Sequence, residues 1–321
     1  MKLGLIGCGK MGGALLAGVI KAKLVKPADI SVCDAIIAAS AAMKKQHPAL
    51  TVCENAAAVA SRSDIVILAV KPKDMQKLLQ SIVANGAERS ETDSRRLPTG
   101  RSEAKSKRKT ENVLYLSIAA GLTTPQLEGW LGGKHRVIRS MPNTPALILQ
   151  GTSAFSRGST ATDADAATAQ SILGAVGIAA EVPETLLDAV TGLSGSGPAY
   201  VYSIIEALAD GGVLMGLPRV TALQFAAQTL VGAAQMVLQT GEHPAALRDN
   251  VTSPGGTTIA GLEQLEKHGL RHSLLQAVRA ATERSKELAK YRSVIYPTRA
   301  ASHAPARLCP CNDPFCNQWP P

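Results

Sequence analysis

A glycine-rich turn directly after the first apolar run constrains the fold of this chain more than any other feature. Gly7-Cys8-Gly9-Lys10-Met11-Gly12 follows the strand-like segment Leu3–Ile6 and opens a helical pattern that runs to about Lys21. In such a unit the first glycine permits the tight turn, the second lets the backbone approach a pyrophosphate, and the third lets helix and strand pack closely. The helix N-terminus adds N–H groups for the anion. The context predicts dinucleotide binding, with a purely structural turn as the alternative.

The pattern along the chain predicts two domains of the α/β class. From Lys2 to about Val182, short apolar runs alternate with helical stretches, which is typical of a parallel sheet covered by helices. The expected strands are Leu3–Ile6, Ile30–Cys33, Ile65–Val70, Val113–Ile118, Arg136–Ser140 and Ala179–Val182. Later stretches have helical periodicity and almost no strand signal, namely Ala199 to Met215, Arg219 to Thr240 and Thr258 to Lys290. We expect a Rossmann-type dinucleotide-binding domain over residues 1–182 and an all-helical domain for dimerisation and substrate over 183–290.

The expected helix over 219–240 is apolar around most of its circumference. Its apolar residues include Leu223, Ala226, Ala227, Leu230, Val231, Ala234 and Val237, with mainly Gln interspersed. A monomer of this size has difficulty burying all of that surface, so the pattern predicts an obligate homodimer, or a higher homo-oligomer, through the helical half. The alternative is a helix that is central to its own bundle.

Two segments lack any apolar period and are expected to be disordered, the insert at 87–111 and the tail at 291–321. Residues 88–110 hold eight Lys or Arg against four Asp or Glu, so much of the net charge of +9 is local. Basic Ser-rich loops are usually just solvated, and an aromatic content of 3% offers few stacking platforms, which makes nucleic acid an unlikely partner. His303, Cys309, Cys311 and Cys316 could bind zinc, but the Cys-x-Cys gap is tight and we expect no metal.

The sequence also predicts a cytoplasmic protein without a membrane anchor. No apolar run approaches the roughly 20 residues that span a bilayer, and the chain begins directly with a strand-like segment. Six cysteines in 321 residues do not make a disulfide framework. Cys8, Cys33 and Cys53, in the nucleotide-binding half, are expected to be reduced.

The ends of the second and third expected strands bear on the choice of cofactor. Asp34 follows the second strand, where a carboxylate can accept hydrogen bonds from ribose hydroxyls and repel a 2′-phosphate. No base follows until Lys44, which favours NADH, but Lys10 could swing over and Asp34 could simply face solvent, so NADH or NADPH remains open. The third strand ends in Ala69-Val70-Lys71-Pro72, whose proline stops the strand where the backbone could border a nicotinamide nucleotide. No second motif for a flavin is visible.

A second glycine-rich turn, at Ser253-Pro254-Gly255-Gly256-Thr257-Thr258, precedes a helical pattern. Its backbone N–H groups have no side chains in the way and can hold a carboxylate. The hydroxyls of Ser253, Thr257 and Thr258 can donate or accept, which suits a small ligand with both an acid and a ring nitrogen. An ordinary helix cap is the alternative.

At this point the order of motifs resembles the pyrroline-5-carboxylate reductases nearly end to end. The matching motifs are IGCGKMG, AVKP, SIAAGL, RSMPNTPA, GLSGSGPAYVY and TGEHPAALRDNVTSPGGTTIAGLEQLE. The match covers about residues 1–86 and 112–290. It implies an enzyme that reduces 1-pyrroline-5-carboxylate to L-proline with NADPH or NADH, the last step of proline biosynthesis.

The resemblance also implies roles for matching residues. Ser253 and the amides of Gly255, Gly256 and Thr257 would hold the substrate carboxylate, and Thr258 would hydrogen-bond the ring nitrogen as the catalytic residue. Together with the strand-end residues, the expected cofactor-binding set is Gly7, Cys8, Gly9, Lys10, Met11, Gly12, Asp34, Asn55, Ala69, Val70, Lys71, Pro72, Ala119, Met141, Pro142 and Asn143. The chain departs from the family in its basic insert, in its tail, and at Lys10, where the family often has Asn or Gln.

Two alternative functions remain open. The β-hydroxyacid dehydrogenases share both domain types. They resemble one another in a Lys and an Asn that follow a glycine-rich turn. This chain has Val201 and Ile205 at those places. A non-catalytic nucleotide sensor, or a nucleic-acid scaffold that uses the basic insert, is the reading from another class.

Overall fold

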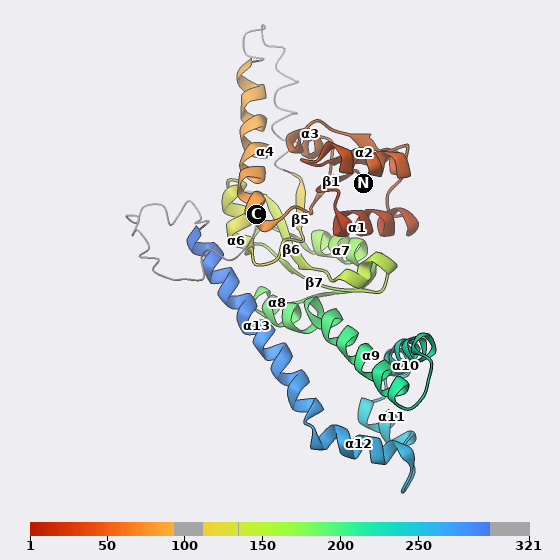
Figure 1. Cartoon of the computed structure of the whole chain (residues 1–321). Coiled ribbons are helices and arrows are strands. Elements are labelled where there is room, and N and C mark those ends of the chain that lie inside the picture. Colours follow the sequence, from red (N-terminus) through yellow and green to blue (C-terminus); the bar gives the residue numbers. More distant parts are fainter. Residues whose placement is uncertain (93–111, 134, 296–321) are drawn as a thin grey trace, which may run out of the picture.

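The computed structural model describes residues 1–92, 112–133 and 135–295. A sheet covered by helices forms one part of the molecule, and an arm of long helices extends from one side of it (Figure 1). The sheet part ends with a strand at Glu181, and the helical part begins at Glu184. The expected fold class, a Rossmann-type domain followed by helices, is confirmed.

One sheet holds all the strands of the described residues, in the order β3-β2-β1-β4-β5-β6-β7-β8. These strands are β1 (Leu3–Ile6), β2 (Ile30–Cys33), β3 (Thr51–Val52), β4 (Ile65–Leu68), β5 (Leu114–Ser117), β6 (Arg136–Met141), β7 (Gly151–Arg157) and β8 (Gly177–Glu181). Strands β1 to β6 are parallel. The order reverses between β1 and β4, which is the switch point at which such sheets bind dinucleotides.

The expectation of a parallel sheet is wrong for its last two strands. β7 pairs antiparallel with β6, and β8 pairs parallel with β7. The short 3-10 helix η3 (Thr144–Ile148) lies in the connection from β6 to β7. A short connection of this kind suffices between antiparallel strands, whereas parallel neighbours need a longer crossover. Neither β7 nor the two-residue β3 was among the expected strands.

Helices cover both faces of the sheet and enclose two cores. One core packs α1 (Lys10–Lys21) and α7 (Asp163–Gly174) on one face, and the other packs α3 (Ala56–Ser61), α4 (Pro72–Thr92) and α6 (Thr124–Trp130) on the opposite face. Successive strand residues alternate between them, as Leu5 and Ile6 do. Because both faces are covered, the parallel strands consist of near-continuous apolar runs, such as the buried Leu3–Ile6.

The expected disordered segments lie mostly outside the described residues. Helix α4 continues to Thr92, six residues into the expected insert at 87–111, because this stretch contains good helix formers and no Gly or Pro. The closing helix likewise continues to Ile295, beyond the expected boundary at 290. The remaining residues, 93–111 and 296–321, lie outside the described part of the chain.

The arm is helical, as expected, with more breaks than its periodicity indicated. It contains α8 (Leu187–Val190), the π-helical turn η5 (Thr191–Gly195), α9 (Gly197–Leu214), α10 (Arg219–Thr240), α11 (Pro244–Asn250), α12 (Thr257–Lys267) and α13 (Leu270–Ile295). The stretch expected as one helix over 258–290 is split at Gly269, whose φ of 71° is a left-handed conformation.

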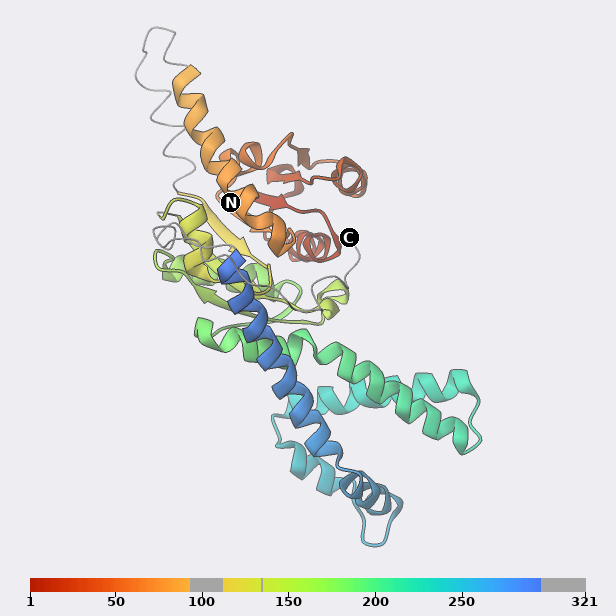
Figure 2. The same ribbon diagram turned by 60° about the vertical axis from the view of Figure 1, so that its left-hand side comes forward.

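Helix α13 runs from the far end of the arm back to the sheet part (Figure 2). It packs there against α8 and η5. A Cβ on Gly192 of η5 would lie 2.7 Å from the carbonyl oxygen of Val278 in α13, so only glycine allows this close approach. The two helices α9 and α10 pair with one another farther out along the arm.

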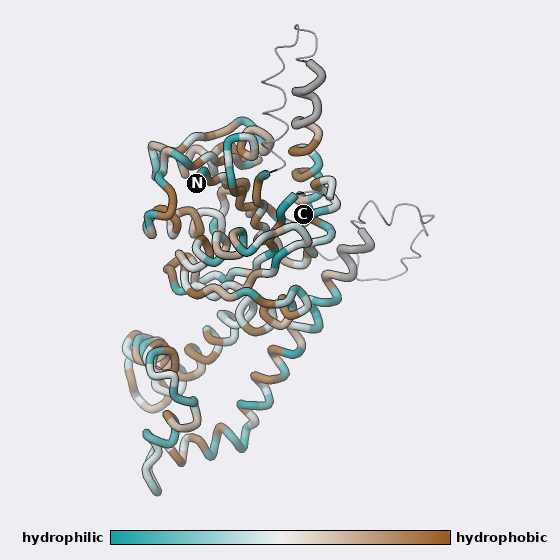
Figure 3. The backbone as a smooth tube through the Cα atoms, turned by 180° about the vertical axis from the view of Figure 1, so that it is seen from behind, coloured by the Kyte–Doolittle hydropathy of each residue, from teal (hydrophilic) through white to brown (hydrophobic). Residues whose placement is uncertain are grey.

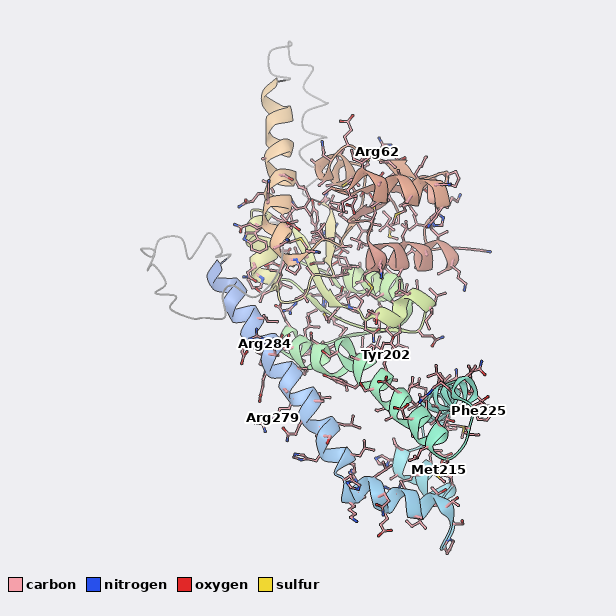
Figure 4. The ribbon with its side chains drawn as sticks, viewed as in Figure 1. Arg62, Tyr202, Met215, Phe225, Arg279 and Arg284 are labelled. Atoms are coloured by element: carbon pink, nitrogen blue, oxygen red, sulfur yellow. The ribbon has the colours of Figure 1, made fainter. Side chains whose placement is uncertain are left out.

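The arm leaves much apolar surface uncovered in a single copy. Figure 3 shows hydrophobic residues recurring along its helices, and Figure 4 shows Tyr202, Met215 and Phe225 along α9 and α10. The exposed fractions of these three side chains are 62%, 83% and 59%. Such a surface requires a cover.

One helix in the described part of the chain, α10, is long and apolar enough to cross a membrane by length and composition alone. The sequence holds no continuous apolar run of this length, because Gln residues interrupt the helix, but its mean hydropathy is high enough to meet the criterion.

Candidate active site

The ends of four parallel strands form one edge of the sheet beside the glycine-rich turn. Ile6 is in register with Cys33 on one side and with Leu68 on the other, and Leu68 is in register with Ser117. The residues expected to bind the cofactor follow these ends and that of β6. The fold therefore gathers the turn at 7–12, Asp34, the segment 69–72, Ala119 and the segment 141–143 at a single edge, where open α/β sheets bind ligands.

The glycines of the turn meet three different spatial demands. Gly7 has a φ of 100°, and a Cβ there would lie 2.5 Å from the carbonyl oxygen of Ala69. A Cβ on Gly12 would collide with the carbonyl oxygen of Gly7. A Cβ on Gly9 would meet no described atom within 4 Å. Gly7 and Gly12 thus keep the turn tight, and Gly9 leaves open space in front of the backbone.

That open space lies at the N-terminus of α1. Gly9 is the N-cap residue and supplies no side chain to cap the helix, and the first turn carries no acid. The first N–H groups of a helix lack intrahelical partners and carry partial positive charge, so they attract phosphate. This turn fits the pyrophosphate of a dinucleotide, and the exposed Lys10 adds a cation at the first helical position.

Asp34 is tied to the turn by its own hydrogen bonds. One carboxylate oxygen accepts from the backbone N–H of Cys8 at 2.6 Å, and the other accepts from the N–H of Ile36 at 2.8 Å. A carboxylate can accept about four hydrogen bonds, so lone pairs remain for a ligand. The side chain is half-buried rather than simply turned to solvent.

Two thiols lie next to Asp34. Burial, and to a smaller extent the Asp34 charge, raises the pKa of Cys8 to about 12. Burial, followed by Cys53 and Asp34, raises the pKa of Cys33 to about 12 as well. Both thiols are therefore protonated and weakly nucleophilic near neutral pH. Cys8, Cys33 and Cys53 are free, while the tail cysteines and His303 lie outside the described residues.

The sheet edge that holds the residues expected to bind the cofactor is called the cofactor edge below. Two further expected cofactor residues, Asn55 and Asn143, also have structural partners. Asn55 is the N-cap residue of α3, and its side-chain oxygen accepts from the N–H of Ala58 at 2.9 Å. Asn143 is buried, and its side-chain oxygen accepts from the N–H of Thr152 at 2.8 Å while its amide donates to the carbonyl oxygen of Ser194 at 3.0 Å. The loop after β6 is thus fastened to η5 of the arm.

Sequence reasoning gave no role to the segment 191–195, although π-helical turns frequently occur at functional sites. A Cβ on Gly195 would lie 2.9 Å from the terminal methyl of Met141, so this turn touches the cofactor edge directly. The motif GLSGSGP was the available signal, but glycines in a sequence do not show which distant residues they contact.

An ion pair that the sequence analysis also missed joins the sheet to the start of the arm. Glu184, in the 3-10 helix η4 (Glu184–Leu186), accepts from the guanidinium of Arg139 on β6 at 3.0 Å. It also accepts from the N–H of Thr124 at 2.8 Å and from its hydroxyl at 2.6 Å. The Arg139 side chain is only 7% exposed. These bonds fix the junction between the two parts.

The second glycine-rich turn has the geometry that its sequence indicated. The N–H of Gly256 donates to the carbonyl oxygen of Ser253 at 3.1 Å, with Pro254 and Gly255 between them. Gly255 has a φ of 68°, which suits the third position of a type II turn after proline. Gly256 is the N-cap residue of α12, with no side-chain cap, so the first N–H groups of this helix face a turn without bulky side chains.

The two candidate regions do not meet within one copy of the chain. Both Figure 1 and Figure 2 place α12 at the far end of the arm, away from α1 and β1. Ser253, Gly255 and Thr257 are exposed there, and Thr258 is half-buried. A site that uses both regions therefore needs a second copy.

Comparisons with known families match both parts. The family described as pyrroline-5-carboxylate reductase dimerisation matches residues 184–288. The family described as NADP oxidoreductase coenzyme F420-dependent matches residues 2–91. The first match begins at the residue where the arm begins.

Comparisons with individual proteins cover nearly the whole chain. A pyrroline-5-carboxylate reductase of Methanosarcina acetivorans is 43% identical, over 90% of this chain and 98% of its own. A solved pyrroline-5-carboxylate reductase of Coxiella burnetii is 32% identical with a TM-score of 0.78, over 89% of this chain and 98% of its own. The Plasmodium falciparum pyrroline carboxylate reductase with NADP bound is 30% identical with a TM-score of 0.72, over 90% and 98%.

Proposed function

Because the chain belongs to the pyrroline-5-carboxylate reductase family, and so reduces 1-pyrroline-5-carboxylate to L-proline with NAD(P)H, we propose that two copies of the chain build each active site. The observation that carries this proposal is the place of the exposed turn at 253–256, at the end of an apolar arm and remote from the glycine-rich turn of its own chain. The cofactor edge of one copy then faces the second turn of its partner.

The protein is a homo-oligomer, as its dimerisation family indicates. We assign the contact between copies to α9 and α10, whose outer surfaces carry many exposed apolar side chains. The exposed large apolar residues there are Val201, Tyr202, Leu208, Leu214, Val220, Leu223, Phe225, Val231, Met236 and Leu238. Their burial explains how a helix that meets the criterion for a membrane span belongs to a dimer.

The turn before α12 supplies the binding site for the substrate carboxylate. Of the three amides expected to hold it, that of Gly256 donates to the carbonyl oxygen of Ser253 within the turn. The amides of Gly255 and Thr257 therefore carry the proposal, and the start of a helix favours an anion. Ser253 adds a hydroxyl beside them, because a Cβ on Gly256 would collide with its Oγ. No general base is needed to hold an acid in this way.

Thr258, on the first turn of α12, hydrogen-bonds the ring nitrogen of the substrate and orients the ring. When bound at the glycine-rich edge, the reduced nicotinamide supplies a hydride to the carbon of the protonated C=N bond. That carbon is already electrophilic, so the protein contributes mainly position, with the reacting atoms held about 3–3.5 Å apart. The turn at 7–12 would hold the pyrophosphate, and Ala69–Pro72, Ala119 and Met141–Asn143 would border the nicotinamide side.

A β-hydroxyacid dehydrogenase needs a base that removes a proton from an alcohol. At the corresponding places after Gly197, helix α9 carries Val201 and Ile205, which cannot accept a proton. An imine reduction needs no such group. We further propose that the protein works in the cytoplasm, where the free thiols of Cys8, Cys33 and Cys53 stay reduced, and that its domains are 1–182 and 183–290 with a tail from 291.

A subunit-mixing experiment tests whether the site is shared. Gly9→Asp places a carboxylate in the open space for pyrophosphate without a collision, and Thr257→Asp places one where the substrate acid binds, at a helix start that tolerates Asp. Each variant alone is expected to be inactive. A twofold dimer with one copy of each has one site free of both changes, so a statistical mixture regains about a quarter of wild-type activity.

Mixed dimers that are no more active than either variant alone would contradict a shared site. Circular dichroism and gel filtration of each variant provide the control, because both must fold and dimerise as the wild type does. Oxidation of NADH or NADPH that depends on added 1-pyrroline-5-carboxylate is the activity measured.

A further inference from the structure

The acid at the end of β2 is built into the cofactor edge. Both oxygens of the Asp34 carboxylate accept backbone N–H groups, one from the glycine-rich turn and one from Ile36. These bonds fix the charge beside the turn instead of leaving it on a mobile side chain. In a Rossmann sheet this position faces the ribose of the adenosine half, where the 2′-hydroxyl of NAD or the 2′-phosphate of NADP lies.

The side chains that directly follow Asp34 offer no positive charge to a phosphate. Ala35, Ile36 and Ile37 carry no charge, and the side chains of Ile36 and Ile37 are 67% and 81% exposed. The next base along the chain, Lys44, lies in the last turn of α2 (Ile37–Gln46) and donates to the carbonyl oxygen of Leu50. Its ammonium group is thus committed at the opposite end of that helix.

Asp34 has two thiols among its neighbours, which contribute no positive charge. Its charge contributes to the raised pKa of both Cys8 and Cys33, after the larger effect of burial, so these neighbours remain uncharged thiols. Lys10 is the cation of the turn itself, and it stands at the first position of α1, where the pyrophosphate binds. A phosphate next to Asp34 would have to overcome the repulsion of a fixed carboxylate.

We propose that Asp34 makes this enzyme select NADH over NADPH, by accepting the adenosine ribose hydroxyls on its remaining lone pairs and repelling a 2′-phosphate. The inference rests on the proposed binding of the dinucleotide at the turn of residues 7–12. It separates this chain from its structural relative with NADP bound and from the NADP oxidoreductase family that matches residues 2–91. The exposed pair Ile36 and Ile37 provides an apolar surface for the adenine.

Binding measured without substrate tests this selection independently of turnover. Isothermal titration calorimetry of the full-length protein with NADH and with NADPH is expected to give an affinity for NADH at least about tenfold higher. The ratio should narrow at high salt, because screening weakens the repulsion. Wild-type protein that binds NADPH as tightly as NADH would overturn the proposal.

Two variants assign the effect to Asp34, and a third serves as the matched control. Asp34→Asn removes the charge, and Ile36→Arg adds a base at an exposed position while keeping the carboxylate. Both should raise the affinity for NADPH relative to NADH about tenfold. Asp64→Asn removes another carboxylate that accepts a backbone N–H, that of Lys2 at 2.7 Å, at the opposite ends of the strands. It should leave the ratio unchanged.

An unchanged ratio in Asp34→Asn, or an equal change in Asp64→Asn, would show that Asp34 does not set the preference. A different result would overturn the proposed function: wild-type protein that binds neither NADH nor NADPH. Tight binding of both, with NADPH preferred, leaves the proposed function intact and defeats only the selection by Asp34.

Discussion

Breaking the ion pair between Arg139 and Glu184 is expected to have a large effect on the free energy of unfolding. Glu184→Ala should lower the free energy of unfolding substantially, because it removes a carboxylate that accepts three hydrogen bonds and leaves the guanidinium of Arg139 without its partner. Breaking a fully buried pair costs about 3–5 kcal/mol. Arg139 is 7% exposed but Glu184 is 26% exposed, so screening by water reduces the expected loss to about 2–4 kcal/mol.

The assay is urea unfolding followed by circular dichroism, at one protomer concentration for all variants because dimerisation contributes to stability. Asp163→Asn is the control. It removes another ion-pair partner of an arginine, Arg157, but the Asp163 side chain is 99% exposed and the urea midpoint should not move.

A double substitution separates the pair from its packing. Arg139→Met combined with Glu184→Leu removes both charges and should recover part of the loss, because no unpaired charge stays buried. The reasoning is refuted if Glu184→Ala unfolds at the wild-type midpoint, or if the double variant is less stable than Glu184→Ala alone.

Three further predictions concern the site. Thr258→Val should lower kcat while the circular dichroism spectrum stays unchanged, and wild-type kinetics would remove Thr258 from the mechanism. Gly12→Ala should weaken dinucleotide binding at least about tenfold, because its Cβ collides with the carbonyl oxygen of Gly7, whereas Gly13→Ala, whose Cβ would lie 3.8 Å from the nearest atom, should bind normally. Cys8 and Cys33, with pKa values raised to about 12, should react with iodoacetamide at pH 8 far more slowly than a free thiol, with the rate increasing only as the pH approaches 12. Rapid modification of either cysteine, seen by mass spectrometry, would contradict their protonated state.

The outline of the sheet was predictable wherever the signal was local. β1 and β2 have the expected bounds, and β4, β5, β6 and β8 lie within two residues of theirs, because each is a compact run between turn signals. β7 escaped because, in Gly151–Arg157, Phe155 is the only large apolar residue, and β3 is too short to leave a pattern. Strand pairing, rather than propensity, creates both.

The contacts that build the site were not predictable in the same way. Asn143 was expected at the cofactor edge, but its bond to Ser194 spans 51 residues, and the bond from Arg139 to Glu184 spans 45. No local pattern encodes such a pairing, since either partner is an ordinary polar residue in sequence.

The sequence by itself determined the chemistry available to this protein. The conformations of the turns at 7–12 and 253–256 can be predicted from their own residues. Glycine, proline and small hydroxyl residues dictate backbone conformation within a few residues. Only the tertiary structure decided where these turns lie, at opposite ends of a long molecule, since the direction of the arm depends on packing between distant segments such as Gly192 and α13. The distance between the turns arises from those long-range contacts, and it is the ground for the proposal that two copies of the chain build each site.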